Sequence, residues 1–231
     1  MLQLFHGSPV RVPAPQQEKC RANNDYGRGF YCTQHPELAK EWACQKGIDG
    51  FCNEYLLDES DLVIVDLNSP DFSILNWLAV LSENRIINAV TPTMQRGQKW
   101  LAEHFSIDLT CADVVKGYRA DDSYFAFTRS FLRNEITLDQ LSEAMRLGEL
   151  GEQYMIKSPA AFAALHYQGS TPAESATYWP LRNRRDQEAR AKYQRIAAAT
   201  PVCSGSAPRK PALYIANLME MEEGELHALL R

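Results

Sequence analysis

The sequence predicts an α+β fold, because strand-like segments are scattered along the chain and separated by helical segments without a regular strand–helix alternation. The composition indicates a folded protein, since 45% of the 231 residues are hydrophobic and 23% are charged, both close to the averages of globular chains. Disordered, collagen-like and coiled-coil classes are therefore excluded.

Charge and hydropathy exclude further classes of protein. The formal net charge of −5 argues against wholesale non-specific binding of nucleic acid, which needs a basic domain. No apolar run reaches the roughly 18 residues of a transmembrane helix, so no membrane partner is expected. The N-terminal sequence MLQLFHGSP lacks the basic and apolar regions of a secretory signal, and we expect a cytoplasmic protein.

The cysteines and histidines show no ligand pattern. The six cysteines are too few for a disulfide scaffold, include no Cys-x-x-Cys pair and are badly spaced for zinc. The five histidines also lack a metal-binding spacing. We therefore expect reduced thiols and no metal site.

The N-terminal elements follow from local composition and periodicity. Leu2–Phe5 is predicted to be a short strand that ends in a His-Gly-Ser-Pro turn. Val10–Asn24, with two prolines, is predicted to be a surface loop, and Gly29–Thr33 a second strand. An amphipathic helix is then expected to begin at Pro36 and to end at Gly47.

The middle of the chain alternates between the two kinds of element. Phe51–Leu57 and Asp61–Leu67 are predicted to pair as strands, the second of them buried on both faces. The segment 69–104 has a helical apolar pattern, and Ala112–Tyr118 is strand-like.

Three helices and a strand are expected to follow. Aromatic residues mark a helix over 124–132, and Thr137 starts the next helix through a capping box with Gln140. Glu152–Ile156 is predicted to be a strand and Ala160–His166 a short helix.

The composition then changes, which predicts two regions: a domain over 1–170 and a helical, basic extension over 171–231. Arg182–Arg195 carries six basic and two acidic residues. A solvated helix face is the default interpretation, and a surface for nucleic acid or an acidic partner is the alternative. Pro201–Pro211 is predicted to be a loop, and a short helix near the C-terminal end is expected to follow it.

The chain lacks the sequence motifs that characterise several classes of enzyme. There is no Gly-x-Gly-x-x-Gly opening a helix after a strand, no phosphate-binding loop, no His-Glu-x-x-His and no Gly-x-Ser-x-Gly. Rossmann dehydrogenases, phosphate-loop NTPases, zincins and α/β-hydrolases are therefore excluded.

Two local motifs remain, and their order is distinctive. His6-Gly7-Ser8 follows the first strand, and the sequence Asp-Tyr-Gly-Arg-Gly-Phe-Tyr ends at Tyr31, just before the amphipathic helix. This order resembles the NAD-binding half of ADP-ribosyltransferases of the diphtheria-toxin and poly(ADP-ribose) polymerase type. The whole chain also resembles a family of bacterial domains of unknown function that share a His…Gly-x-Gly-Phe-Tyr…Gln pattern and a segment matched by residues 119–122.

The resemblance implies a split β-sandwich fold with inserted helices and a helical C-terminal extension. It also implies NAD as substrate, with His6 and Tyr31 as the first two members of a His-Tyr-Glu signature. Gln153 stands where the third member, a glutamate, would be. The residues that the resemblance assigns to NAD binding are His6, Gly7, Ser8, Tyr26, Gly29 and Tyr31.

The chemistry of these residue types suits NAD. A glycine after the histidine lets the backbone approach the carboxamide, a neutral His6 can bond a ribose hydroxyl, and the Tyr31 ring offers a stacking face. The third position departs from the pattern, because Gln153 can make hydrogen bonds but supplies no charge.

Another carboxylate is one remedy for that missing charge. Glu152 is adjacent, but on a strand its side chain should point to the opposite face. Asp121 or Asp122 could supply the charge, and the catalytic set we expect is His6, Tyr31, Gln153 and Asp122. The alternative is that the two aspartates only cap the following helix.

The function that the resemblance implies is mono-ADP-ribosylation of a macromolecule, either protein or nucleic acid, by a toxin-like enzyme that an antitoxin-like partner protein holds in check. Two alternatives stay open. One is a non-catalytic module that binds NAD or ADP-ribose, and the other is an NAD glycohydrolase with water as the acceptor.

Overall fold

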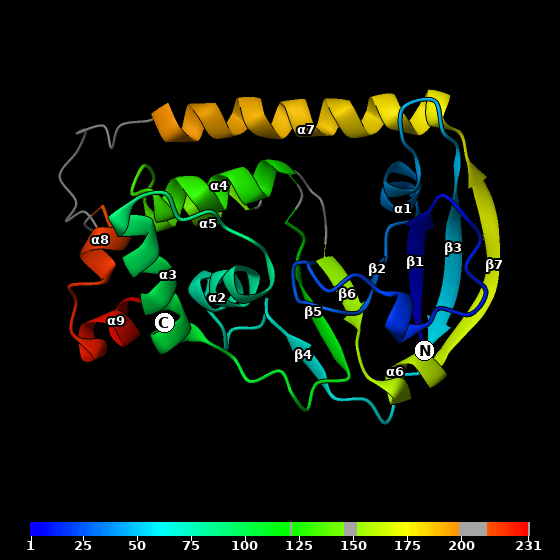
Figure 1. The fold of residues 1–231 in the computed structure, drawn as a ribbon, viewed down its shortest axis with the longest axis horizontal. Coiled ribbons are helices and arrows are strands. Elements are labelled where there is room, and N and C mark those ends of the chain that lie inside the picture. Colours follow the sequence, from blue (N-terminus) through cyan, green and yellow to red (C-terminus); the bar gives the residue numbers. More distant parts are fainter. Residues whose placement is uncertain (121, 146–151, 199–211, 231) are drawn as a thin grey trace.

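The structure is a computed structural model that describes residues 1–120, 122–145, 152–198 and 212–230. Within these ranges the chain forms a mixed α+β fold, as the sequence predicts, with helices packed around a seven-stranded mixed sheet (Figure 1). The loop expected over Pro201–Pro211 and the side chains of Asp121 and Asp122 lie outside the described part of the chain.

The strand order of the sheet is β4-β5-β6-β2-β1-β3-β7. Only the β4–β5 pair is parallel among the described strands, and the other neighbours are antiparallel. The strands are β1 (Leu2–Ser8), β2 (Phe30–Thr33), β3 (Gly50–Leu57), β4 (Ile64–Asp66), β5 (Val114–Tyr118), β6 (Glu152–Ile156) and β7 (Leu165–Ala173).

The sheet opens between its two central strands. In the described residues, β1 and β2 share the single register pair Phe5–Thr33, whereas β1 pairs with β3 along its whole length and β2 pairs with β6 from Phe30 to Thr33. Beyond Phe5 the two strands therefore diverge, and the His-Gly-Ser segment lies at the mouth of this opening.

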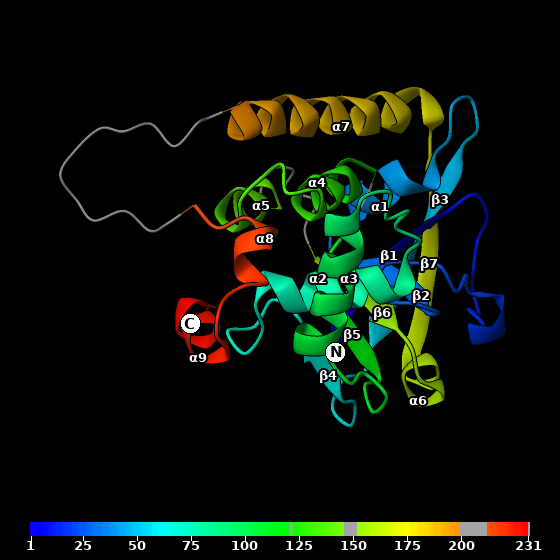
Figure 2. The same cartoon turned by 60° about the vertical axis from the view of Figure 1, so that its left-hand side comes forward.

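The helices lie mainly on one side of the sheet and at its far end (Figures 1 and 2). A short 3-10 turn, Gln17–Lys19, interrupts the loop after β1. The α-helices are α1 (Pro36–Ala43), α2 (Ile74–Asn84), α3 (Pro92–Phe105), α4 (Asp122–Leu132), α5 (Leu138–Ala144), α6 (Pro159–Ala163), α7 (Ser175–Ala198), α8 (Ile215–Leu218) and α9 (Glu223–Leu230).

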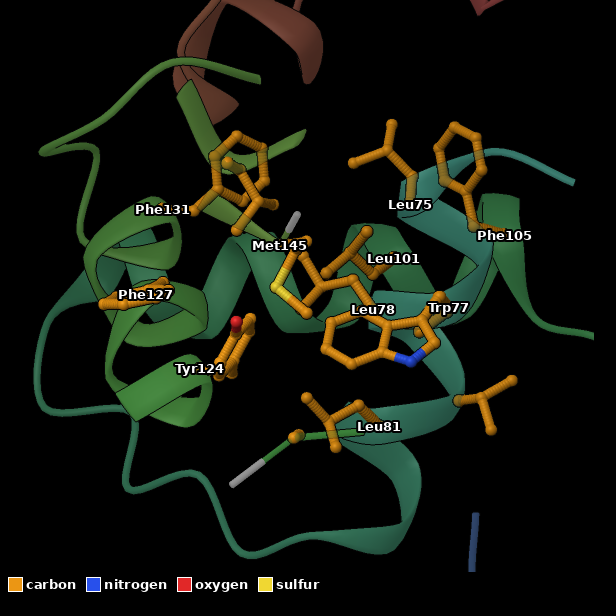
Figure 3. Packing of buried hydrophobic residues seen from close by; sticks show 14 of the residues in the cluster. Leu75, Trp77, Leu78, Leu81, Leu101, Phe105, Tyr124, Phe127, Phe131 and Met145 are labelled. Atoms are coloured by element: carbon orange, nitrogen blue, oxygen red, sulfur yellow. The ribbon is translucent and has the colours of Figure 1, made fainter. Parts of the chain in front are cut away.

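The main hydrophobic core lies between the sheet and helices α2 to α5. Trp77 and Leu78 of α2, Leu101 of α3 and Phe127 of α4 have at most 1% of their surface exposed and pack together (Figure 3). A second cluster covers the opposite face of the sheet, around Tyr55 and Ile156. Hydrophobic clusters thus cover both faces of the sheet and hold its strands, including the opening between β1 and β2, in place.

Helix α7 crosses the top of the molecule and packs on α1, α4 and α5 (Figure 2). It connects the strand end of the fold to the helical end, with Tyr193 stacked on Phe127 at 4.1 Å between ring centroids. Among the described helices, none combines the length and the apolar character needed to cross a membrane.

The structure corrects two predictions in the N-terminal half. The His-Gly-Ser segment is not a turn, because β1 continues to Ser8, where the backbone still pairs with Phe51 of β3. The predicted pairing of Phe51–Leu57 with Asp61–Leu67 is also wrong. The second segment supplies β4, which pairs in parallel with β5 and so needs the long crossover formed by α2 and α3.

Three further predictions on element boundaries need correction. The segment 69–104 forms two helices, because α2 ends at Asn84 and a new helix, α3, begins at Pro92 after the N-cap Thr91. The helix expected over Ala160–His166 ends at Ala163, because the following residues pair with β3 as strand β7. The expected domain boundary at residue 170 falls inside that strand.

Candidate functional site

A pocket of about 760 Å³ lies at the opening between β1 and β2. We refer to it as the main pocket. Its volume falls within the range of about 300–1,000 Å³ that is typical of small-molecule sites. Its lining comes from His6–Ser8 of β1, much of the loop 9–25, Gly29 with the start of β2 (Phe30 and Tyr31), and the single residues Trp42, Arg85, Arg119, Ala120 and Gln153.

His6 bridges the two strands where their pairing ends. Its Nδ1 lies 2.7 Å from the carbonyl oxygen of Tyr31, and its ring lies against Phe30 at 4.1 Å between centroids. A carbonyl oxygen only accepts, so Nδ1 carries the proton and a neutral ring keeps a lone pair on Nε2. Burial lowers the pKa of His6, while the bond to Tyr31 opposes this shift. The neutral form is therefore favoured at pH 7.

Tyr31 closes the loop that precedes β2. Its hydroxyl donates to the carbonyl oxygen of Gly27 at 2.8 Å and accepts from the backbone N–H of Tyr26 at 2.9 Å. Gly27 has a φ of 91°, in the left-handed region that favours glycine. Burial raises the pKa of Tyr31 well above its usual value. The hydroxyl is thus a neutral brace for this loop, and the ring is the part that lines the pocket.

Gln153 and Asp25 form a buried pair at the floor of the main pocket. The Gln153 side chain donates through Nε2 to Oδ2 of Asp25 at 2.8 Å and to the carbonyl oxygen of Tyr118 at 3.3 Å. Gln153 is 4% exposed and Asp25 5% exposed, and both line the pocket. With Nε2 engaged, Oε1 of Gln153 is the atom that can accept from a ligand hydroxyl.

Asp25 is held from two further directions. Its Oδ1 accepts from Arg85 at 2.9 Å, and its Oδ2 also accepts from the backbone N–H of Ala120 at 2.9 Å. A buried carboxylate is costly unless it is paired and hydrogen-bonded, and here both conditions are met. The negative charge missing from position 153 is therefore present one hydrogen bond away.

Sequence reasoning did not assign a role to Asp25, although this residue opens the motif that ends at Tyr31. Its partner Gln153 lies 128 positions away in the sequence. The only local signal is an acidic residue beside a glycine-rich turn, which by itself is more typical of a loop. Trp42 of α1 also lines the main pocket, and the guanidinium of Arg119 lies 3.6 Å from the centroid of its ring.

The remaining residues expected to bind NAD lie in different surroundings. Ser8 and Gly29 line the main pocket, and Ser8 Oγ accepts from the backbone N–H of Val10. Tyr26 is 4% exposed, its hydroxyl donates to the carbonyl oxygen of Tyr118 and accepts from Trp77, and it is absent from the pocket lining. Tyr26 is thus a core residue that supports the pocket from behind.

Gly7 lines the main pocket, but its missing side chain serves the packing of α1. A Cβ atom there would lie 1.9 Å from the carbonyl oxygen of Ala39 and 2.8 Å from the backbone nitrogen of Ala43. The expectation that this glycine lets the backbone approach a ligand is therefore incomplete, because glycine is required by the helix alone.

The structure distinguishes among the candidates for the missing carboxylate. Asp122 begins α4, and its side chain lies outside the described part of the chain. Glu152 pairs with Lys116 at 2.8 Å and does not line the main pocket, in agreement with the alternation of side chains along a strand. Asp25 is thus the described carboxylate that meets Gln153.

Comparison with known proteins gives one match. No curated protein and no solved structure matches the chain. The model of the family described as "Protein of unknown function (DUF3990)" matches residues 2–167, which is more than half of the chain. The matched range contains every described residue that lines the main pocket and ends before α7. The chain therefore belongs to the DUF3990 family.

Proposed function

We propose that the protein is an NAD-dependent mono-ADP-ribosyltransferase that modifies a macromolecule. One observation carries this proposal: a single pocket contains His6, Tyr31 and Gln153, and a buried carboxylate, Asp25, contacts Gln153. The opening of the sheet between β1 and β2 supports the finer fold assignment, a split β-sandwich of the ADP-ribosyltransferase type. We place the enzyme in the cytoplasm, where its cysteines would stay reduced.

The pocket has the polar atoms that a bent dinucleotide needs. Nε2 of His6 and Oε1 of Gln153 are acceptors for ribose hydroxyls, and the Tyr31 ring offers a face to the nicotinamide. The backbone of Gly7 can pair with the carboxamide through its N–H and C=O groups. The volume of about 760 Å³ also suits a ligand of this size.

In the proposed reaction the bond between C1′ of the nicotinamide ribose and the ring nitrogen breaks, and its electron pair leaves with nicotinamide. A lone pair of the acceptor forms the new bond to C1′, and the proton of the acceptor passes to solvent. Positive charge develops at C1′ before the new bond is complete. Groups placed to stabilise that charge lower the barrier most.

Asp25 would act through Gln153. Accepting a hydrogen bond from Nε2 polarises the amide and makes Oε1 a stronger acceptor for the ribose 2′-hydroxyl. The bond from Arg85 and the bond from Ala120 keep the carboxylate oriented without a ligand. Asp25 is thus a positioning residue, and Gln153 is the residue that would touch the substrate.

The test is incubation of the purified protein with NAD labelled in the adenylate part, with and without a cell lysate. Free nicotinamide together with label on a macromolecule supports the transferase. Free nicotinamide without labelled macromolecule supports the NAD glycohydrolase, and neither signal supports a binding module. His6→Ala should abolish any nicotinamide release, and wild-type turnover by a folded His6→Ala variant would exclude the proposed site.

A further inference from the structure

A second pocket, of about 250 Å³, adjoins the main pocket. The two pockets share Trp42, Arg85, Arg119 and Ala120 in their linings. The opposite wall of the second pocket comes from α7, through Trp179, Arg182, Asn183, Arg185 and Asp186. This wall lies outside the range that the family model matches. We call this second pocket the arginine pocket, because Arg85, Arg119, Arg182 and Arg185 line it.

The charge of the arginine pocket is positive. Among its described lining residues, four arginines face the two carboxylates of Glu41 and Asp186, and Arg85 also pairs with the buried Asp25 at 2.9 Å. Glu41 is 3% exposed, and both of its oxygens accept from Arg185, at 3.0 and 2.8 Å. Asp186 pairs with Arg190, one turn further along α7, at 2.8 Å. Basic groups thus outnumber acidic ones among the described side chains that line the pocket, in a chain whose net charge is −5.

Two guanidinium groups of the pocket lie over tryptophan rings. Arg119 lies 3.6 Å above the centroid of Trp42, and Arg182 lies 5.7 Å from the centroid of Trp179. Such contacts orient the planar fork of arginine, whose donors match the oxygens of a phosphate group. Tryptophan faces are also the surfaces on which nucleic-acid bases stack. The pocket thus combines oriented phosphate donors with tryptophan rings, whose faces these guanidinium groups cover.

The rest of α7 has the same character. The helix carries six basic and two acidic residues, and Arg184, Arg190, Lys192 and Arg195 are exposed. A positive surface therefore continues from the pocket along the helix. Basic grooves with interleaved aromatic rings are typical of proteins that bind single-stranded nucleic acids.

We propose that the arginine pocket binds a phosphate group of a single-stranded nucleic acid, which is the acceptor of the ADP-ribose. The assignment of this ligand as acceptor rests on the proposed function, whereas the phosphate site itself does not. The shared wall at Trp42 and Arg119 would place the bound nucleotide next to the main pocket. A phosphate could also come from NAD itself, so the experiment separates the two sources.

The experiment compares Arg182→Ala with Arg184→Ala. Both residues lie on α7, but Arg182 lines the arginine pocket, whereas Arg184 points outside it and pairs with Glu188 at 4.0 Å. The probes are a labelled single-stranded oligonucleotide of mixed sequence, a phosphopeptide of equal charge, and NAD. Affinities are measured between about 50 and 200 mM salt, because phosphate contacts are salt-dependent.

Arg182→Ala should weaken oligonucleotide binding about tenfold and reduce the salt dependence by roughly one phosphate contact, while Arg184→Ala stays within about twofold of wild type. NAD affinity should not change in either variant. Equal oligonucleotide binding by the two variants would overturn the proposal. So would a loss of NAD affinity alone, or tighter binding of the phosphopeptide. If wild type fails to cleave NAD but the Arg182 effect is present, the proposed function fails and the phosphate site stands.

Discussion

His6 owes its candidate role to a proton that is fixed by the fold. The Tyr31 carbonyl holds the hydrogen on Nδ1, and burial favours the neutral ring. The Nε2 atom of His6 therefore stays available as an acceptor at physiological pH without any charged partner.

The lowered pKa of His6 predicts a pH dependence of stability. Between the folded pKa and the ordinary value of 6.5, the unfolded chain binds more protons than the native protein. Stability should therefore fall as the pH drops below about 6.5, until the folded pKa is passed. Urea unfolding at several pH values measures this effect. His6→Gln should lose this part of the dependence, and an unchanged profile in the variant would contradict the neutral histidine.

Gln153→Glu tests the contact with Asp25. The variant would place a second carboxylate within about 2.8 Å of Oδ2 of Asp25. Two carboxylates in contact share a proton, so the pKa of one carboxyl is raised in the folded state. The native variant then binds more protons than the unfolded chain above about pH 4, and its stability should fall as the pH rises towards 8. Melting temperatures at pH 5 and pH 8 give the result, and a pH-independent difference from wild type would show that the two side chains do not meet.

At the scale of elements, α1 and β1 are locked together at Gly7. The carbonyl oxygen of Ala39 occupies the space in which a Cβ atom would stand. Because backbone atoms fill this space, the strand or the helix would have to move to admit a side chain. That movement would also displace His6, the next residue along β1.

Gly7→Ala should therefore destabilise the protein by about 1–3 kcal/mol or more, which is the usual cost of overpacking. Gly224→Ala in α9 is the matched control, since nothing lies within 4 Å of the added Cβ. That control should be neutral or stabilising by up to about 1 kcal/mol, because alanine favours helices. The free energy of unfolding in urea compares the two, and equal stability of both variants would show that the contact with α1 is looser.

Local patterns predicted most elements but not their partners. The strand Glu152–Ile156 and the capping box of Thr137 with Gln140 are both present as predicted. The partner of β4 could not be predicted, because two adjacent strand-like segments suggest a hairpin and the parallel partner follows only after two helices. The start of β7 was likewise hidden, since its residues acquire strand structure by pairing with β3.

The prediction of the candidate site had the same limit, because motifs identify residues but not their tertiary contacts. The expected positions of His6, Tyr31 and Gln153 came from a motif, and the structure gathers their side chains around one pocket. Asp25 could not be assigned, because its significance arises from contacts with Arg85, Ala120 and Gln153, which are distant in sequence. Burial and pairing of this kind belong to tertiary structure and leave no periodic signal.

At the scale of the whole molecule, the part of the chain that the family model matches and helix α7 have separate roles. The family fold provides the main pocket, and the basic helix α7 encloses the arginine pocket beside it. A chain with a net charge of −5 thus concentrates positive charge on one helix. We propose that this uneven distribution of charge guides a nucleic acid to the edge of the proposed NAD site.

The central claim is that Asp25 supplies, through Gln153, the negative charge on which NAD cleavage depends. The most direct measurement is the rate of nicotinamide release by wild type, by Asp25→Asn and by Asp25→Asn combined with Gln153→Glu, with Asp66→Asn as the control for loss of a partly buried ion pair. The account predicts that kcat falls on the order of 10²-fold in Asp25→Asn with little change in KM, and that the double variant recovers activity because it restores one carboxylate to the pair. Wild-type turnover by a folded Asp25→Asn variant, or a double variant no more active than the single one, would contradict it.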